Sequence, residues 1–296
     1  MNRSVARRLS RSLILTILLA ATTVLAGAQE AKATDLKILS WNVYMLPSPL
    51  KISLQKDRTD DIVAKLAATD YDALFFQEAF SSYFRDLMIK KLGKKYPYSY
   101  YLKRDKKLTH ILGSGVFVMS RLPMKVLDRV YYKECGGFDC FAAKGAVLVE
   151  LQTPSKERVQ FAVTHLQSSL KETKDRLSQL EQIHGMFADY ASKSVPQFLI
   201  GDLNIIGKTT EFKVALRVSQ MEAAPLLGPI QWTSGRVNNC YKIPGNTQDW
   251  IDHLWMKPSS KVRAAGMTVR NFEFVHKGQR CPDSDHYAME SRIRLY

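Results

Sequence analysis

The residues best suited to chemistry follow a short apolar run in the second half of the chain. Residues 198–200 (Phe-Leu-Ile) read as a buried strand, Gly201 marks its end, and Asp202 and Asn204 come directly after it. Residues two apart in an extended segment point to the same side, so this carboxylate and this carboxamide would face one pocket at the rim of a sheet. The alternative is a strand followed by an ordinary Asp/Asn turn.

Other polar side chains of useful types occupy the same kind of position. At or near the ends of other expected strands lie Asn42, Glu78, His165, Asp252 with His253, and Asp285 with His286. If these strands share a sheet, their ends converge on one rim. Taken singly, each has a structural explanation, such as a first-turn helix acid for Glu78 or a turn residue for Asp285. Their recurrence at six strand ends favours a common site.

The residue types at these ends suit metal-assisted hydrolysis at phosphorus. Hard oxygen donors such as Glu78 and Asn42 suit Mg²⁺ or Ca²⁺. Of two histidines near such a metal, one can accept a proton from the attacking water, and the other can donate to a phosphoryl or leaving-group oxygen. Asp252 is available to fix the tautomer of the base. Neither the G-x-S-x-G of a serine nucleophile nor the H-E-x-x-H of a zinc protease is present in the sequence.

The elements that would position these residues alternate at first and then become mostly strands. Strands are expected at 36–41, 72–77, 115–120, 124–132, 143–151, 158–164, 198–201, 250–256, 261–270 and 289–295, and helices at 57–68, 80–92, 171–190 and 209–218. The short turns between the four strands from 115 to 164 favour antiparallel pairing. No internal repeat or low-complexity linker is visible. We therefore expect one α/β domain in which two sheets pack face to face with helices outside.

Residues 1–28 have the layout of a secretory signal. Four arginines precede an apolar run over residues 13–26, and residues 26–28 (Ala-Gly-Ala) offer a cleavage site, with residues 31–33 as a second. A membrane anchor is the alternative, but the run is shorter than the ~20 residues that a spanning helix needs. We expect a secreted or periplasmic protein whose catalytic domain occupies residues 35–296.

The four cysteines fit an oxidising destination. They are Cys135, Cys140, Cys240 and Cys281, and neither a C-x-x-C pair nor a histidine spacing typical of zinc accompanies them. Disulfides are therefore favoured over a metal site. Four cysteines permit three pairings, of which a Cys135–Cys140 loop across the intervening glycine pair is favoured, leaving Cys240 for Cys281.

The chain is strongly basic. Its formal charge is +15, and loss of the four arginines within residues 1–28 lowers this to +11. Such a charge suits anionic partners, including nucleic acid, phospholipid and cell-wall polymer. Between residues 90 and 107, lysines and an arginine are interleaved with tyrosines, a pattern that can bind a nucleic-acid strand. A solvated helix end followed by a tyrosine-rich edge strand is the structural alternative.

The motifs, taken in chain order, resemble those of the endonuclease/exonuclease/phosphatase (DNase I-like) superfamily. They are Trp41-Asn42-Val43, Phe76-Gln77-Glu78, Gly113-Ser114-Gly115-Val116, Thr164-His165-Leu166, Gly201-Asp202-Leu203-Asn204, Ile251-Asp252-His253 and Ser284-Asp285-His286. The resemblance covers nearly the whole chain after the expected signal. It implies a four-layer α/β/β/α sandwich with two packed mixed sheets, and hydrolysis of phosphate esters with a divalent cation.

Finer details resemble the bacterial neutral sphingomyelinases (sphingomyelinase C). The extended matches are residues 42–47, 77–80, 164–167, Arg176 with Gln179-Leu180, and residues 284–287. By this resemblance Glu78 is the principal metal ligand with Asn42 assisting, and Asp285 helps to hold the metal or its water. The resemblance makes His286 the general base, which Asp252 orients. It also implies that His165 and Asn204 stabilise the transition state while Asp202 positions groups around it.

The implied enzyme is a Mg²⁺-dependent phosphodiesterase, with Mn²⁺ or Co²⁺ as substitutes. It would cleave sphingomyelin to ceramide and phosphocholine at a phospholipid membrane surface, with no obligate protein partner. The residues at 272–281 correspond to an aromatic hairpin of these enzymes, but here the tip at Lys277-Gly278 is polar and suits gripping anionic head groups. His253 stands where tyrosine is common. The alternatives are a secreted DNase-like endonuclease, a phosphoinositide phosphatase, and a toxin-like membrane-binding module in which hydrolysis is secondary.

Overall fold

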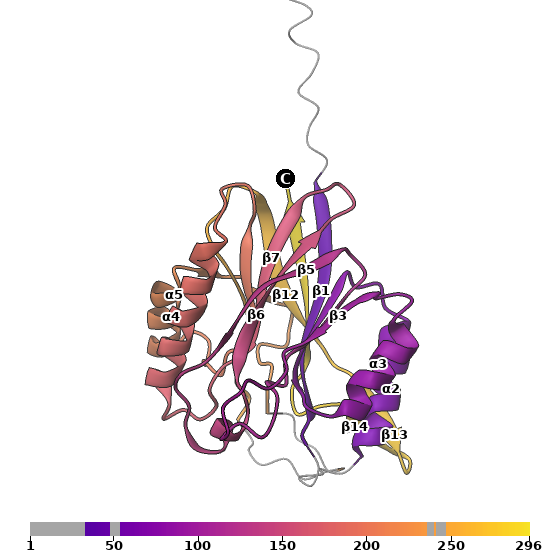
Figure 1. Ribbon diagram of the computed structural model, residues 1–296. Helices are drawn as coiled ribbons and strands as arrows, with labels where there is room; N and C mark the ends of the chain where they lie inside the picture. The colour runs from indigo at the N-terminus through magenta and orange to yellow at the C-terminus, as the bar shows by residue number, and fades with distance from the viewer. Residues whose placement is uncertain (1–32, 48–53, 236–239, 241–246) are drawn as a thin grey trace, which may run out of the picture. The chain divides into compact units, whose positions relative to one another are not determined.

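Two mixed β-sheets packed face to face form the centre of the fold (Figure 1). The computed structural model describes residues 33–47, 54–235, 240 and 247–296. Residues Thr34–Leu295 form a single unit. The expected secretory signal at residues 1–28 lies outside the described residues and stays a prediction.

The first sheet has seven strands in the order β10-β12-β15-β1-β2-β4-β3. Their bounds are β1 Thr34–Met45, β2 Ala73–Ala79, β3 Tyr98–Tyr101, β4 Phe117–Ser120, β10 Leu226–Leu227, β12 Val262–Arg270 and β15 Ala288–Leu295. β1 is parallel to β2 and antiparallel to β15. The carboxyl ends of β1 and β2 therefore lie at the same edge as the start of β15.

The second sheet has six strands in the order β5-β6-β7-β8-β11-β9. Their bounds are β5 Met124–Tyr131, β6 Gly145–Gln152, β7 Arg158–His165, β8 Gln197–Asp202, β9 Glu222–Ala223 and β11 Asp252–Met256. β8 is parallel to β7 and antiparallel to β11, so the ends of β7 and β8 meet the start of β11. A separate hairpin pairs β13 (Glu273–His276) with β14 (Gln279–Pro282).

Helices cover the outer faces of the two sheets (Figure 1). α2 (Gln55–Ala67) and α3 (Ser82–Leu92) cover the seven-stranded sheet, while α4 (Thr173–Asp189) and α5 (Thr210–Ser219) cover the six-stranded one. Three apolar cores follow: Phe75, Phe161 and Phe198 lie between the sheets, Trp41 and Phe84 under α2 and α3, and Leu180 and Trp255 under α4 and α5. The expected four-layer α/β/β/α architecture is confirmed.

The expected antiparallel run of four strands is correct for β5, β6 and β7 but wrong for β4. β4 pairs with β2 and β3 in the other sheet. The chain changes sheets within residues 121–123: the Arg121 N–H donates to Asp72 O in the first sheet, and Pro123 O accepts from Gln152 N in the second. Because β3 lies at an edge beside β4, the tyrosine-rich edge strand considered within residues 90–107 is confirmed.

Both favoured disulfides are present. The Cα atoms lie 5.2 Å apart in Cys135–Cys140 and 5.7 Å apart in Cys240–Cys281. The first closes a loop that carries a short 3₁₀ helix, η1 (Gly137–Phe141), and the second ties Cys240 to β14. Among the described residues, no helix combines the length and the apolar character needed to cross a membrane.

Candidate active site

The predicted site residues meet at one edge of the sandwich, but they come from both sheets. Asn42 and Glu78 lie in β1 and β2, Asp285 and His286 directly precede β15, His165 and Asp202 end β7 and β8, Asn204 follows β8, and Asp252 begins β11. A single shared sheet, the condition under which the sequence placed these strand ends on one rim, is not what brings them together. Each sheet brings part of the set to its own edge, and face-to-face packing joins the two parts.

In the six-stranded sheet, Asp202 lies between two predicted partners. The strand register places it directly beside His165 on β7 and Asp252 on β11. Gly201 allows this close pairing, because a Cβ atom at that position would lie 2.0 Å from Thr164 O, and its φ of +142° disfavours any other residue. The glycine is therefore needed for strand approach at the site.

Asn204 reaches the site by a different route from the one expected. An extended segment would turn Asp202 and Asn204 to the same face, but Asn204 has left-handed backbone with a φ of +52°. This turn lets its N–H donate to Asp202 Oδ1 at 3.0 Å, while Asn204 Nδ2 donates to Leu166 O at 3.1 Å. The two residues do meet, through a turn.

The side-chain amide of Asn42 bonds one carboxylate from each sheet. Asn42 Nδ2 lies 3.1 Å from Glu78 Oε1 and 3.0 Å from Asp202 Oδ2. Asn42 was expected at the end of its strand, but β1 continues to Met45 through an irregularity in its pairing with β2. Tyr44 and Glu78 have φ values of +50° and +52° at this irregularity. Such backbone costs about 1–3 kcal/mol per residue and re-aims side chains, as is common at functional sites.

The surroundings of Glu78 fit a divalent cation. Within the described residues, its buried Oε2 atom has no hydrogen-bond partner. Burial, and then the charge of Asp285, raise the pKa of Glu78 to about 7. Burial also raises the pKa of Asp285. Two neighbouring carboxyl groups with an unsatisfied oxygen form a hard donor set of the kind that Mg²⁺ or Ca²⁺ would complete.

The hydrogen bonds of His286 orient its imidazole ring as a proton acceptor requires. Its Nδ1 lies 2.9 Å from Asp252 Oδ2, and its Nε2 faces Asp202 Oδ2 at 3.7 Å. The Nδ1–H···carboxylate bond leaves Nε2 as the nitrogen that can take up a proton. Burial opposes the imidazolium, but the charges of Asp252 and Asp202 outweigh it and raise the pKa of His286. Trp41 Nε1–H donates to the His286 carbonyl at 3.1 Å and fixes the backbone.

Asp202, Asp252 and His286 could themselves hold a metal ion, since one ligand atom from each lies within 4.8 Å of the others. Their atoms already bond one another or neighbouring donors. His286 Nδ1 is engaged by Asp252, and Asp202 accepts from Asn42 and Asn204. The unsatisfied oxygen of Glu78 therefore makes the stronger case for an ion.

His165 is buried and neutral at pH 7. Burial, and then the charge of Lys144, lower its pKa to about 4, and its Nε2 lies 3.5 Å from Asp202 Oδ2. Lys144 is a neighbour that sequence reasoning missed. Its ammonium is buried, donates to Leu166 O at 2.7 Å and pairs with Asp139 Oδ2 at 2.8 Å. No motif marks it, because a lone lysine before a strand is usually exposed.

Two buried arginines brace the backbone around the site. Arg58 on α2 donates from Nε to Asp283 O at 2.7 Å and from Nη2 to Tyr44 O at 3.1 Å. It therefore joins the irregular end of β1 to the segment that carries His286. The sequence did not predict this role, because the pattern around Arg58 indicates only a helix. Arg176 on α4 donates to Gln167 O at 3.2 Å and holds the loop that follows His165.

His253 is the residue of the sequence pattern that the site does not include. Its neighbour Asp252 faces His286, whereas the His253 ring packs with Trp250, Phe212 and Trp255 beneath α5. His253 Nε2 lies 2.7 Å from Ile205 O, and burial lowers the pKa of His253 to about 4. Its role is structural.

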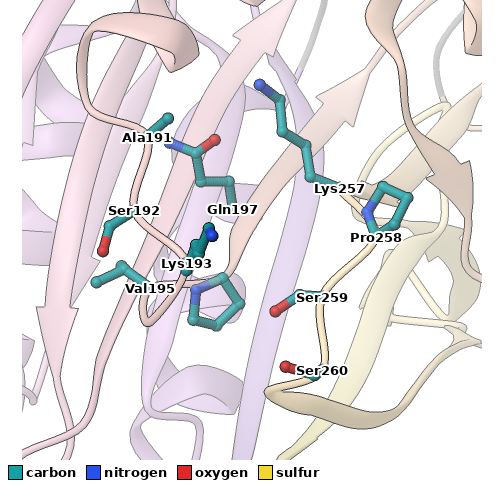
Figure 2. Close-up of a pocket in the computed structure, with 10 residues that line it drawn as sticks. Ala191, Ser192, Lys193, Val195, Gln197, Lys257, Pro258, Ser259 and Ser260 are labelled. Atoms are coloured by element: carbon teal, nitrogen blue, oxygen red, sulfur yellow. The ribbon is translucent and has the colours of Figure 1, made fainter.

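A cavity of about 480 Å³ lies at the opposite end of β8 from Asp202 (Figure 2). Lys193, Lys257 and several serines line it, and the Lys257 ammonium lies 5.3 Å from the centre of the Phe187 ring. Burial lowers the pKa of Lys257. Among the described residues that line this cavity there is neither a carboxylate nor a histidine, so it lacks the groups for phosphoryl chemistry.

Comparison with known proteins identifies a family and several relatives. The model of the Endonuclease/Exonuclease/phosphatase family matches residues 39–286. "Sphingomyelinase C 2" of Leptospira interrogans is 28% identical in an alignment of 260 residues that covers 78% of this chain and 40% of that protein. "Phospholipase C" of Staphylococcus aureus is 25% identical in an alignment of 268 residues that covers 83% of this chain and 81% of the relative. The chain thus spans two fifths of the Leptospira protein's length.

Solved structures share the fold. Beta toxin from Staphylococcus aureus, in a mutant with bound magnesium ions, superposes with a TM-score of 0.74 at 24% identity, covering 87% of this chain and 99% of its own. D. rerio TDP2, complexed with a single-strand DNA product, gives a TM-score of 0.64 at 16% identity, covering 89% and 99%. The family match and the sphingomyelinase relatives together support a phosphoric diester hydrolase.

Proposed function

Because the chain belongs to the endonuclease/exonuclease/phosphatase family, we propose that it is a Mg²⁺-dependent phosphodiesterase that hydrolyses sphingomyelin to ceramide and phosphocholine. One observation carries the proposal: an unsatisfied Glu78 oxygen and an Asp252–His286 pair share one edge of the sandwich. The first suits a cation and the second suits proton transfer from water. Relatives that are named sphingomyelinases favour sphingomyelin as the substrate.

The route of proton transfer follows from the hydrogen bonds of His286. His286 keeps Nδ1–H on Asp252, so Nε2 accepts the proton as water attacks phosphorus in line with the leaving oxygen. The resulting imidazolium lies between two carboxylates that stabilise its charge. His165 is neutral and can donate a hydrogen bond to a phosphoryl oxygen without adding charge. Asn204 has a second amide hydrogen for the same purpose, because Leu166 O takes only one.

Glu78 and Asp285 would hold the magnesium ion, with Asn42 beside them. When bound, the ion offsets negative charge on the phosphoryl and leaving oxygens. Asn42 binds both Glu78 and Asp202 and so sets the distance between the metal carboxylates and the phosphate side. Mn²⁺ and Co²⁺ are expected to substitute, because the donors are oxygen atoms without a strong geometric demand.

The protein is proposed to be secreted or periplasmic. Residues 1–28 have the pattern of a secretory signal, and the four cysteines pair in two disulfides, which are typical of oxidising compartments. Its partner there would be a phospholipid membrane surface that contains sphingomyelin.

A nuclease is the second candidate, favoured by the charge of +11 that remains after removal of residues 1–28. The basic, tyrosine-rich segment within residues 90–107 supports a nuclease less well in the structure than in the sequence. Tyr96 is 1% exposed, and the Tyr101 ring is covered by the Arg85 guanidinium at 3.8 Å. Tyr98 and Tyr100 remain as partly accessible rings, a small platform for stacking bases.

The test is to offer sphingomyelin vesicles and supercoiled DNA side by side, with Mg²⁺ and with EDTA. We expect phosphocholine release in Mg²⁺, loss of release in EDTA, and no nicking of the DNA. The Glu78→Gln protein serves as a matched control for contaminating enzymes. Nicking without phosphocholine release would replace the lipid assignment with the nuclease.

A further inference from the structure

Five large apolar side chains are exposed on three loops beside the catalytic edge. These are Leu108 at 98% exposure, Phe138 at 90%, Leu170 at 68%, Ile111 at 64% and Phe141 at 49%. We call them the apolar rim. Exposure of this much apolar surface in one neighbourhood costs solvation free energy and usually marks an interaction surface.

Hydrogen bonds join the three loops. The Ile111 N–H donates to Phe141 O at 2.9 Å, which links the loop of Leu108 to η1. The rings of Phe138 and Phe141 lie 6.4 Å apart. The Gly136 N–H donates to Gln167 Oε1 at 3.0 Å, which links η1 to the loop that carries Leu170. The three loops that carry the rim are therefore neighbours in the fold.

The loops are braced, so the exposed side chains are presented by a defined backbone. The Cys135–Cys140 disulfide closes the η1 loop. Asp139 Oδ2 accepts from the Ser168 N–H at 2.7 Å, and Arg176 donates to Ser169 O at 2.5 Å. A surface loop that needed no partner would turn its large apolar side chains inward, where they would gain burial.

The rim lies on the His165 side of the site. Its third loop directly follows His165, and Lys144 ties Leu166 at the start of that loop. The β13–β14 hairpin precedes the segment of His286 and lies beside α2, where Lys65 Nζ donates to Glu273 O (Figure 1). Of the large apolar side chains in the described hairpin, only Val275 is strongly exposed, at 70%. The larger apolar surface is therefore on the other side of the site from the hairpin.

Positive charge accompanies the apolar side chains. Lys103, Arg104, Lys106 and Lys107 are exposed on the loop that carries Leu108 and Ile111. The neighbouring carboxylate, Asp105, is engaged by His110 Nδ1 at 2.6 Å. Cations beside projecting apolar groups match a phospholipid bilayer, which offers phosphates at its surface and acyl chains just beneath. A nucleic acid would meet the cations but offers no apolar phase for Leu108, Phe138 and Leu170.

We propose that the apolar rim docks this protein on a phospholipid bilayer. Phe138, Leu170 and Leu108 enter the acyl boundary while the cations of residues 103–107 contact lipid phosphates. Docking in this orientation brings the His165 side of the site against the head groups. The inference rests on the proposed function for its substrate, but the docking itself is measurable without turnover.

The experiment uses the full chain in EDTA with vesicles of equal parts phosphatidylcholine and sphingomyelin, so that binding is measured by flotation without hydrolysis. The variant is Phe138→Ser with Leu170→Ser. We expect vesicle affinity to fall by at least about tenfold, because two apolar side chains no longer leave water. Leu227→Ser is the matched control, since Leu227 is 48% exposed on β10, outside the rim. Its affinity should equal that of the unmodified protein.

A second readout separates docking from chemistry. Hydrolysis of a monomeric, short-chain sphingomyelin in Mg²⁺ should be the same in the rim variant and the unmodified protein. Unchanged vesicle binding by the rim variant would overturn the proposal, as would a protein that fails to bind vesicles. Loss of binding in Val275→Ser alone would assign docking to the hairpin instead. Vesicle binding that depends on the rim, in a protein that hydrolyses no phosphodiester, would uphold docking and refute the proposed function.

Discussion

Glu78 and Asp202 accept hydrogen bonds from the same Asn42 amide, yet their surroundings shift their pKa values in opposite directions. Burial disfavours both carboxylates. For Asp202, burial raises the pKa, but electrostatic interaction with the His165 and His286 imidazoles and the hydrogen bond from Asn42 outweigh it and lower the pKa. For Glu78, burial and the charge of Asp285 together raise the pKa to about 7. The favourable interactions prevail over burial at Asp202, whereas at Glu78 burial and Asp285 prevail over the Asn42 hydrogen bond and the charge of His286.

This difference divides the site into two halves. The metal half comprises Asn42, Glu78 and Asp285, and it would be completed by a cation from outside the chain. The proton half comprises His165, Asp202, Asp252 and His286, in which Asp252 bonds His286 and both histidines lie within 4 Å of Asp202. The comparison predicts that changes in the metal half alter ion binding, whereas changes in the proton half alter turnover and leave ion binding intact.

Glu78→Gln should have the largest effect on activity. It removes the main carboxylate of the metal half, and loss of several kcal/mol of charge stabilisation corresponds to a fall in turnover of at least ~10³-fold. In EDTA, thermal unfolding should occur at the same temperature as for the unmodified protein, or higher, because an unsatisfied buried carboxylate is removed. Phosphocholine release and thermal melts measure the two effects. Near-normal turnover would refute the metal half.

Asp252→Asn should have the next largest effect, through the proton half. An amide at this position no longer fixes the His286 tautomer or stabilises its charge, so turnover should fall by ~10²–10⁴-fold. In His286→Ala, turnover should fall at least as far. Turnover of the double variant should be little lower than that of His286→Ala, because the two residues act as a unit. Initial rates in Mg²⁺ provide the comparison. Additive losses would show that the pair does not act together.

His253→Phe should have the smallest effect, on stability rather than on turnover. Burial lowers the pKa of His253 to about 4, below the ordinary value of 6.5. Between these values the unfolded chain binds a proton that the folded chain does not, so the stabilisation is complete above pH 6.5 and is lost as the pH falls toward 4.

The substitution leaves Ile205 O without its hydrogen-bond partner and should lower the free energy of unfolding by about 1–3 kcal/mol at pH 8. It should also reduce the loss of unfolding free energy between pH 6.5 and 4. Part of that loss should remain, because the pKa of His165 is lowered as well. Urea unfolding at several pH values checks this. If the unfolding free energy of the variant changed with pH as it does in the unmodified protein, His253 would have to be protonated in the folded protein.

The sequence predicted the layers and the gathering of the candidate site residues at one edge, because strand ends and motif order are local signals. It could not place β4 and β5 in different sheets, because the choice depends on distant partners of residues 121–123, Asp72 and Gln152. It also missed Lys144 and Arg58, since their roles depend on carbonyl groups of residues far along the chain. The left-handed conformation of Glu78 carries no signature in residue type, whereas Asn204 is of a type that adopts it more readily than most.

The division of the site into two halves is tested most directly by calorimetric titration of Mg²⁺ into the unmodified protein, Glu78→Gln and Asp252→Asn. We predict that the unmodified protein and Asp252→Asn bind Mg²⁺ with the same affinity, whereas Glu78→Gln loses most of its binding. Loss of binding in Asp252→Asn with retention in Glu78→Gln would place the ion among Asp202, Asp252 and His286 and contradict the account.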